Sequence, residues 1–417
     1  MTLPFAHDPV FSHREALLDP AFVASCLARH CEWATRITRV ERVRVTYRIG
    51  DSLRVRHRFE ADGREYHVAA RAFGPGRSAR AFAKALADGD TRDAAAPGVV
   101  HTPPVEAVFW IFPNDRRVAT LKIIDAARES LSSRLARPWV ESRLIAWAPE
   151  NSATLQCLDA GRSVLAYAKV GAGARREYEQ YLAIGDALAQ TGADVRVPRP
   201  IAFSPAHDTM LIEAIAGRRL TYDPPDMRAI GVALAHLHGL PLTGLPAFER
   251  FRPASRRDAA DLVVRSLPAL APAIERLEAE LARRENGADQ PGCLHGDIHA
   301  KNAIVSGARA TLIDVEEMTW GARAADLGSL LARLRHARTL GDCSSAAADA
   351  GADALLDGYA GVSALPDAAA VRWHTAAALL VERVQRTVTR VYTRGLQVLD
   401  EQLAEATRLL ISPGGPR

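Results

Sequence analysis

A block of strand-like segments followed by a helix occurs twice in the first half of the chain. From about Val40 to Phe73 apolar and polar residues alternate, with a turn at Ala61-Asp62-Gly63, and this pattern predicts a three-strand meander. GPGRSARAFAKALADG then has helical spacing. The same order recurs further along the chain. Three strand-like segments, SRLIAWAP, TLQCLDA and SVLAYAKV, are followed there by the helical segment GAGARREYEQYLAIGDALAQ. We interpret the two blocks as an internal duplication, with coincidence of two β-rich units as the alternative.

The second half of the chain is dominated by helical patterns. DMRAIGVALAHLHGL and AADLVVRSLPALAPAIERLEAELARRE have apolar residues three and four apart, and long helical stretches follow residue 324. One β-rich island, CLHGDIHAKNAIVSGARATLIDVEE, interrupts them. The island therefore lies within an otherwise helical region.

Composition excludes several classes of protein. No apolar run reaches the ~18–20 residues of a membrane span, and the N-terminal segment lacks the pattern of a secretory signal. The five cysteines are scattered without a CxxC pair, which favours a reducing cytoplasm over disulfides or a zinc site. The formal charge is only +4, and acids are interspersed with the arginines, so we expect no nucleic-acid partner.

The island holds the densest set of chemically active residues. Asp297 and Asn302 bracket a short loop between strands, and Asp314 follows at the end of the apolar strand ATLI. An Asp, an Asn and a second Asp that meet across a hairpin suit a hard cation that shares phosphate oxygens, namely Mg²⁺. The remaining aspartate is then free to accept a proton from a hydroxyl nucleophile.

These residues resemble a known family. HGDIHAKN followed by LIDVEEMTWGARAADLGSL is similar to the Brenner-type motif and metal-binding segment of the aminoglycoside phosphotransferase and choline kinase group, which are small-molecule kinases with the protein-kinase fold. The resemblance continues upstream of these motifs, in AYAKV, a glutamate-bearing helix, VPRPIAF, MLIEAIAG and ALAHLHGL. In all it covers about residues 145–335. HRD and DFG are absent, and no APE follows LIDVEE, which argues against a protein substrate.

The resemblance implies roles for the residues of the island. Asp297 is the expected catalytic base, and Asn302 and Asp314 are the expected Mg²⁺ ligands. His295 is expected to brace the loop, and Glu316 to reach the second metal shell or the substrate. The cofactors implied are ATP and Mg²⁺.

The resemblance also implies a set of nucleotide-binding residues. They are Lys169, Glu177, Glu179, Ser152, Glu213 and Ala214. Lys169 is expected to reach the α- and β-phosphates, steadied by one of the two helix glutamates, and the adenine to lie against the backbone from Leu211 to Ala214. The family's glycine-rich loop is missing, because Glu150-Asn151-Ser152-Ala153 occupies that turn. The amides of this turn and the Ser152 hydroxyl are the remaining phosphate donors.

The expected fold class is α/β (α+β), a protein-kinase-like bilobal fold. Residues 1–140 are expected to form an N-terminal α+β unit that is a degenerate repeat of the small lobe. Residues 141–215 form the β-rich small lobe, and residues 216–417 the helical lobe with the catalytic loop. We expect a cytoplasmic enzyme with no membrane partner, and the sequence does not fix its oligomeric state.

The acceptor is expected to be a hydroxyl group of a small polar metabolite. The N-terminal unit resembles the cap of maltokinase-like proteins in layout, so a sugar is the first choice. An amino alcohol is expected beside the sugar. An aminoglycoside-type antibiotic is the second choice, because cationic aminoglycosides need an acid-lined pocket and the helical half is not rich in acids.

Two other functions fit part of the pattern. GDIH also occurs in metallophosphoesterases, but the downstream ligand motifs that they need are missing. A kinase-like protein that binds nucleotide or metabolite without turnover is the other alternative. The missing glycine-rich loop keeps it open, whereas the presence of Asp297, Asn302, Asp314 and Lys169 together argues against it.

Lysine is rare in this chain. It occurs only at Lys84, Lys122, Lys169 and Lys301, whereas 49 of the 53 basic residues are arginine. A lysine on the strand that precedes the helix is therefore unlikely to arise by chance, and arginine does not replace a compact ammonium on a phosphate. Composition thus supports the role of Lys169, while Lys301 contacts either the γ-phosphate or only solvent.

Overall fold

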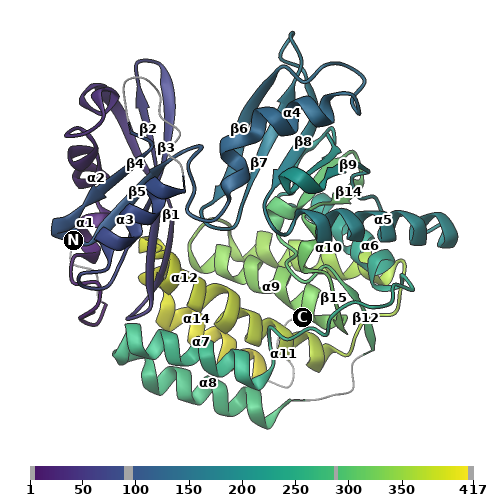
Figure 1. The fold of residues 1–417 in the computed structure, drawn as a ribbon. Helices are drawn as coiled ribbons and strands as arrows, with labels where there is room; N and C mark the ends of the chain where they lie inside the picture. The colour runs from purple at the N-terminus through teal and green to yellow at the C-terminus, as the bar shows by residue number, and fades with distance from the viewer. Residues whose placement is uncertain (1–4, 89–96, 286–289, 412–417) are drawn as a thin grey trace. The chain divides into compact units, whose positions relative to one another are not determined.

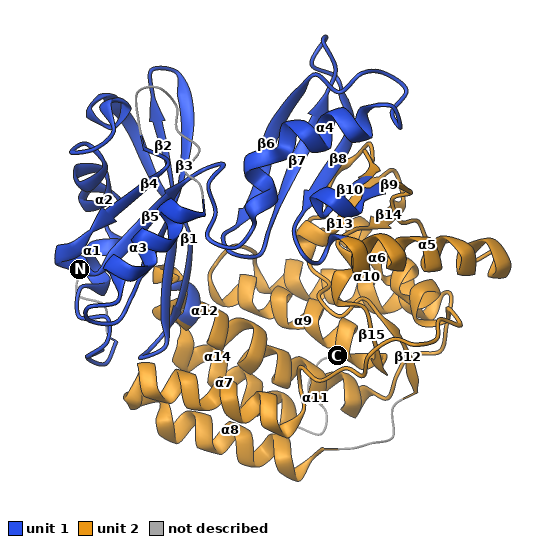
Figure 2. Ribbon diagram, in the orientation of Figure 1, with its two compact units in different colours: residues 1–174, 202–211, 389–391 blue, residues 175–201, 212–388, 392–417 orange. Residues whose placement is uncertain are grey.

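The computed structural model describes residues 5–88, 97–285 and 290–411. The chain divides into two compact units (Figure 2). Unit 1 comprises Met1–Ala174, Ala202–Leu211 and Thr389–Val391, and unit 2 comprises Arg175–Ile201, Ile212–Val388 and Tyr392–Arg417. The chain thus passes into unit 2 for the second time between Leu211 and Ile212, within the segment expected to hold the adenine.

The first five-stranded sheet has the order β1-β2-β3-β5-β4 (Figure 1). Its strands are β1 (Ile37–Arg48), β2 (Ser52–Ala61), β3 (Arg64–Ala72), β4 (Val99–Thr102) and β5 (Ala107–Ile111). All four strand pairs are antiparallel, as the alternating pattern predicts for the first three strands. The helices that accompany them are α1 (Arg14–Leu18), α2 (Pro20–Leu27), α3 (Ser78–Ala87) and α4 (Ile124–Ser132).

The second five-stranded sheet repeats this order as β6-β7-β8-β10-β9. Its strands are β6 (Glu141–Ala148), β7 (Ser152–Leu158), β8 (Val164–Val170), β9 (Pro200–Ser204) and β10 (Thr209–Glu213). One helix follows the third strand in each block, α3 in the first and α5 (Ala174–Thr191) in the second. Turn residues with positive φ recur at matching places in the two sheets, at Gly50 and Glu150, Asp62 and Arg162, and Glu106 and Asp208. The same topology and the same turns support the interpretation as a duplication.

Unit 2 is mainly helical. Its longer helices are α5, α6 (Pro224–His238), α7 (Pro253–Ser266), α8 (Ala271–Arg283), α9 (Ala324–Thr339), α10 (Ser345–Ala360), α11 (Ala368–Ala378) and α14 (Leu399–Ile411). Helix α9 buries nearly every residue of its first three turns, so it forms the centre of this unit. The β-rich island contributes β12 (Pro291–Leu294), β13 (Ala303–Ser306) and β14 (Arg309–Leu312) to two small sheets. Strand β11 (Arg218–Arg219) pairs with β13 in one of them, and β15 (Thr319–Ala322) pairs with β12 in the other.

The helical stretch near the C-terminus is interrupted twice, which the sequence pattern does not show. A π-helical segment, Leu379–Val384, follows α11, and α12 (Gln385–Arg390) ends before Val391, whose φ is +50°. The short α13 (Thr393–Leu396) then leads to α14. Thr387, Val388 and Thr389 are β-branched and weaken a continuous helix, and π-helical segments often mark functional sites.

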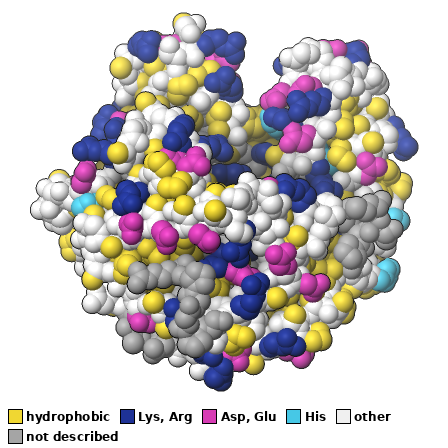
Figure 3. Space-filling model, turned by 180° about the vertical axis from the view of Figure 1, so that it is seen from behind, with side chains coloured by type: hydrophobic (Ala, Val, Ile, Leu, Met, Phe, Trp, Pro, Cys, Tyr) yellow, Lys and Arg dark blue, Asp and Glu magenta, His cyan; other side chains and the backbone are white. Residues whose placement is uncertain are grey.

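The mixed α/β class expected from the sequence is confirmed. No helix among the described residues is long and apolar enough to cross a membrane. On the face drawn in Figure 3, Lys and Arg side chains are interspersed with Asp and Glu.

Candidate functional site

The loop 295–302 connects β12 to β13 and presents Asp297. The side chain of Asn302 donates a hydrogen bond from Nδ2 to the carbonyl of Asp297 at 3.0 Å, which closes the loop on itself. Gly296 has a φ of +79°, and a Cβ built on it would lie 2.1 Å from the carbonyl oxygen of Glu317, so only glycine fits there. His295 is buried, and its Nε2 is hydrogen-bonded to the carbonyl of Ile313 at 3.0 Å.

A buried carboxylate at the start of α9 anchors this loop. Asp326 accepts hydrogen bonds from the backbone N–H groups of His295 (2.7 Å) and Gly296 (3.1 Å) and lies 3.2 Å from Nε2 of His238. Burial opposes its ionisation, but the bonds from His238 and the loop lower the pKa of Asp326 below its usual value. Nδ1 of His238 is in turn hydrogen-bonded to the Tyr359 hydroxyl at 3.0 Å. Asp326 was not among the residues predicted from the sequence, although a charged residue beside the apolar LGSLLARL pattern is a signal.

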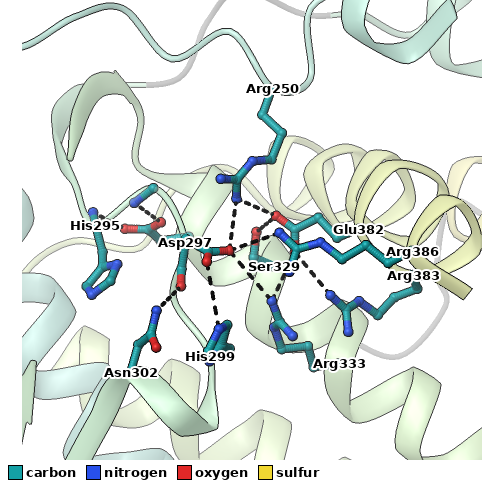
Figure 4. Close-up of polar contacts among 12 residues, drawn as sticks. Arg250, His295, Asp297, His299, Asn302, Ser329, Arg333, Glu382, Arg383 and Arg386 are labelled. Carbon is teal, nitrogen blue, oxygen red and sulfur yellow. Dashed lines mark hydrogen bonds and ion pairs between the residues drawn. The ribbon is translucent and has the colours of Figure 1, made fainter. Parts of the chain in front are cut away.

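The carboxylate of Asp297 lies among arginines from three separate segments of unit 2 (Figure 4). Its Oδ1 is 3.2 Å from Nη2 of Arg386, 3.4 Å from Nη1 of Arg250 and 4.0 Å from Nη2 of Arg333. His299 lies on the other side, with Nε2 3.7 Å from Oδ2 of Asp297. The side chain of Asp297 remains 23% exposed, so it can meet a substrate.

These charges keep Asp297 ionised. Burial by itself raises the pKa of Asp297, but Arg386 and Arg250 outweigh it and lower the pKa below its usual value. Burial, together with Arg333, lowers the pKa of His299 to about 4, so this imidazole is neutral near pH 7. Its Nδ1 accepts a hydrogen bond from the backbone N–H of Lys301, so its Nε2–H faces the carboxylate. The Lys301 side chain is exposed.

A second group, of three carboxylates, gathers in the same unit. Single oxygens of Glu177, Asp314 and Glu316 all lie within 4.8 Å of one another. The backbone N–H of Asp314 donates to the Tyr181 hydroxyl at 2.9 Å, which ties the end of β14 to α5. Oxygen donors at this spacing fit a hard divalent cation such as Mg²⁺. Asp314 was expected here as a ligand, whereas Glu177 was expected beside Lys169.

The sequence left Glu177 and Glu179 as alternative partners of Lys169, and the two glutamates differ in burial. Glu177 is buried and contributes to the three carboxylates, whereas Glu179 is exposed on α5. Residues two apart on a helix point to nearly opposite faces.

The remaining predicted residues lie on β7, on β8 and after β10. Ser152 begins β7, and Lys169 on β8 is paired with Thr154 of β7. A Cβ on Gly171 would lie 2.5 Å from the carbonyl oxygen of Asn151, so glycine lets the end of β8 approach the β6–β7 turn closely. Glu213 ends β10 and accepts hydrogen bonds from the N–H of Arg199 and the guanidinium of Arg196, and Ala214 follows it.

A buried glutamate and four arginines near Asp297 were missed by the sequence analysis. They are Arg250, Arg333, Glu382, Arg383 and Arg386. The signal available was the run ALLVERVQRTV, in which a glutamate and two arginines interrupt an otherwise apolar helical pattern. Its π-helical segment carries Glu382 and Arg383.

Comparison with known proteins identifies the family. The model of the phosphotransferase enzyme family matches residues 150–374, which is more than half of the 417-residue chain. The curated proteins contain no match.

Solved structures of several kinases match this chain at low identity. A choline/ethanolamine kinase family protein from Mesorhizobium loti is 18% identical over 70% of this chain and 96% of its own, with a TM-score of 0.45. An ethanolamine kinase from Plasmodium vivax is 13% identical over 72% of this chain and 91% of its own, with a TM-score of 0.48. The amicoumacin kinase hAmiN, solved with AMP-PNP, Ca²⁺ and its antibiotic, is 12% identical over 71% and 97%, with a TM-score of 0.49. The family match confirms the membership expected from HGDIHAKN and LIDVEE: the chain belongs to the phosphotransferase enzyme family and is a small-molecule kinase that phosphorylates hydroxyl groups.

Proposed function

We propose that this protein transfers the γ-phosphoryl group of ATP, with Mg²⁺, to a hydroxyl of a small polar metabolite. One observation carries the proposal: an ionised carboxylate, Asp297, is fixed by Asn302 in the same unit as three converging carboxylates. Phosphoryl transfer needs a base that orients the acceptor and a cation that neutralises the phosphates. Asp297 would be the base, and the three carboxylates would hold the cation.

In the proposed reaction Asp297 accepts the proton of the acceptor hydroxyl. The acceptor oxygen forms a bond to the γ-phosphorus while the bond from that phosphorus to the β–γ bridging oxygen breaks, and ADP leaves. Glu177, Asp314 and Glu316 would hold the cation, and the sequence motif adds Asn302 as a ligand. The charge of the cation would stabilise the phosphate oxygens. His295 and Asp326 keep the loop in place while the proton moves to Asp297.

The nucleotide is proposed to contact Lys169 and the turn at Ser152, with the adenine at Glu213 and Ala214. A compact ammonium on β8 suits the α- and β-phosphates, and the close approach at Gly171 supports a fixed turn at residues 151–152. We assign residues 141–215 as the nucleotide lobe and residues 1–140 as a degenerate copy of that lobe, on the matching strand orders of the two sheets. Residues 216–417 are assigned as the acceptor lobe.

The test is the turnover of the Asp297→Ala variant. We expect its ATP-dependent phosphorylation to fall by roughly a hundredfold or more, because the base is gone, while ATP·Mg²⁺ still raises the melting temperature of the protein. The matched control is Asp353→Ala, at an exposed aspartate on α10 of the same unit. Turnover that is unchanged in Asp297→Ala rules out this role.

Binding without turnover is the second candidate. Glu150-Asn151-Ser152 stands where a glycine-rich loop was expected, and this departure favours it. ATP·Mg²⁺ that stabilises the wild-type protein, but is not consumed with any sugar, amino alcohol, aminoglycoside or hydroxy acid, supports this alternative.

A further inference from the structure

The surroundings of Asp297 in unit 2 carry an excess of positive charge. Four guanidinium groups, those of Arg250, Arg333, Arg383 and Arg386, each lie within 4.0 Å of at least one of two carboxylates, those of Asp297 and Glu382 (Figure 4).

Glu382 is the hub of this arginine cluster. Its side chain is 1% exposed, and its Oε1 accepts hydrogen bonds from Nη1 of Arg250 and from the Ser329 hydroxyl, both at 3.0 Å. Arg333 and Arg383 lie 3.6 and 4.0 Å from Oε2. Four electrostatic partners hold the pKa of Glu382 below its usual value although burial opposes this, so Glu382 cancels one positive charge and no more.

Two of the arginines have unsatisfied donors. Nε and Nη2 of both Arg333 and Arg383 are buried and find no hydrogen-bond acceptor within the described part of the chain. The Arg333 side chain is only 9% exposed. A buried guanidinium N–H without an acceptor is costly, so these atoms favour an anionic ligand with several oxygens.

His299 and Glu317, which lie near the arginine cluster, do not offset its excess of positive charge. His299 is neutral near pH 7, and Glu317, which acts electrostatically on Arg250, is exposed to solvent. The three carboxylates Glu177, Asp314 and Glu316 form a separate group, which is proposed to hold the cation.

We infer that the acceptor is an anion, an alcohol that also carries a carboxylate or a phosphate group, and that the arginine cluster binds this group. The inference rests on the proposed function, because the cluster surrounds the base that would take the hydroxyl proton. Arg250 and Arg386 both contact the same Asp297 oxygen, so an anion held by the cluster brings its hydroxyl to Asp297. The amino alcohols and aminoglycosides expected earlier are cations and would be repelled here.

The first experiment compares acceptors that share a carbon skeleton and differ in the charge of one substituent. Phosphorylation by ATP is measured with 3-hydroxypropionate, propane-1,3-diol and 3-aminopropan-1-ol, and with glucuronate, glucose and glucosamine. Glycerol 3-phosphate against glycerol forms a third arm, which separates phosphate from carboxylate recognition. We expect the anion of at least one series to have a kcat/KM about tenfold or more above its neutral and cationic counterparts. A neutral or cationic member that is as good in every series overturns the inference while the proposed kinase function survives.

The second experiment tests the cluster itself. Arg386 is 37% exposed on α12, so Arg386→Gln is expected to fold. We expect it to lower kcat/KM for the anion about tenfold and that for the neutral partner less than threefold, with the KM for ATP unchanged, and Arg386→Lys to restore part of the preference. The control is Arg276→Gln, at an exposed arginine of α8. An unchanged preference, or an effect confined to the KM for ATP, overturns the inference.

Binding covers the case in which no acceptor is turned over. Calorimetric titration with 3-hydroxypropionate and glycerol 3-phosphate should show binding to the wild-type protein that is weakened in Arg386→Gln. Failure of both anions to bind overturns the inference, whereas binding without ATP consumption overturns only the proposed kinase function.

Discussion

Arg71 on β3 donates hydrogen bonds from Nη1 to both carboxylate oxygens of Glu150, at 2.7 and 2.6 Å. Glu150 occupies the β6–β7 turn with a φ of +68°, and its side chain is 5% exposed. Arg116 and Arg54 lie 3.0 and 3.5 Å from the same carboxylate. The first sheet of unit 1 therefore holds, through Arg71, the turn that precedes Ser152.

This contact predicts a role for the N-terminal block in nucleotide binding. Arg71→Gln leaves the buried Glu150 carboxylate with fewer partners and loosens the turn, so we expect the KM for ATP to rise about tenfold, with a smaller change in kcat. Initial rates at varied ATP measure this. The control is Arg80→Gln, at an exposed arginine of α3. An unchanged KM for ATP would show that the turn does not depend on Arg71.

Arg71 and Lys169 occupy equivalent positions in the two sheets. Arg71 is paired with Arg54, two residues after β2 begins at Ser52, and Lys169 is paired with Thr154, two residues after β7 begins at Ser152. The first block thus has an arginine where the second has one of the chain's four lysines. Arg71 binds a carboxylate of the chain itself, whereas Lys169 is proposed to bind phosphates.

The two positions should therefore respond differently to exchange. We expect Lys169→Arg to lower kcat/KM for ATP about tenfold or more, because the planar guanidinium does not replace a compact ammonium, whereas Arg71→Lys keeps one bond to Glu150 and costs less than threefold. Steady-state kinetics of the pair measure the difference. Equal losses in both variants would contradict a nucleotide role specific to Lys169.

The three carboxylates predict which helix glutamate matters. Glu177→Gln removes one charge from the group with Asp314 and Glu316, so we expect the Mg²⁺ concentration for half-maximal activity to rise several-fold. Glu179→Gln, two residues away and exposed, is the matched control and should leave it unchanged. A Mg²⁺ titration at saturating ATP tests this, and equal behaviour of the two variants would exclude Glu177 as a ligand.

The sequence alone could have predicted which of Glu177 and Glu179 lies on the buried face of α5. The buried face of α5 includes Tyr181 and Ile184, which are four and seven residues after Glu177, so helical phase alone places Glu177 on that face. The meander and the island were equally predictable, because alternation and turn residues are local signals.

The arginine cluster was not predictable in the same way. Arg250 lies in a loop, Arg333 on α9 and Arg386 on α12, and no local pattern relates these segments. In a chain with 49 arginines, any one of them carries little information. Only the tertiary packing around Glu382 brings them together.

The cluster predicts a shift in the pH profile. Arg386 is the largest electrostatic cause that lowers the pKa of Asp297, against burial that raises it. Arg386→Gln therefore raises the pKa of Asp297. Because the base works only when ionised, the variant loses activity at a higher pH than the wild-type protein does when the pH is lowered. With a neutral acceptor, the kcat/KM of the variant relative to wild type should be near its maximum at about pH 7.5 and fall as the pH approaches about 4. A ratio that is constant with pH would contradict the electrostatic coupling.

Asp326 predicts a stability effect at the base of the same loop. Asp326→Asn keeps the shape of the side chain but removes the charge that accepts from His295, Gly296 and His238, so we expect a loss of about 3 kcal/mol in the unfolding free energy, with reduced kcat. Because the folded-state pKa of Asp326 is lowered, its contribution is present above the ordinary aspartate pKa and is lost as the pH falls through the folded value. The melting temperature difference between wild type and Asp326→Asn should therefore be large at about pH 7 and shrink below about pH 4. Calorimetry at several pH values measures this difference, and Asp353→Asn, at an exposed aspartate, is the control. A difference that does not shrink in acid would show that the charge of Asp326 is not what stabilises the loop.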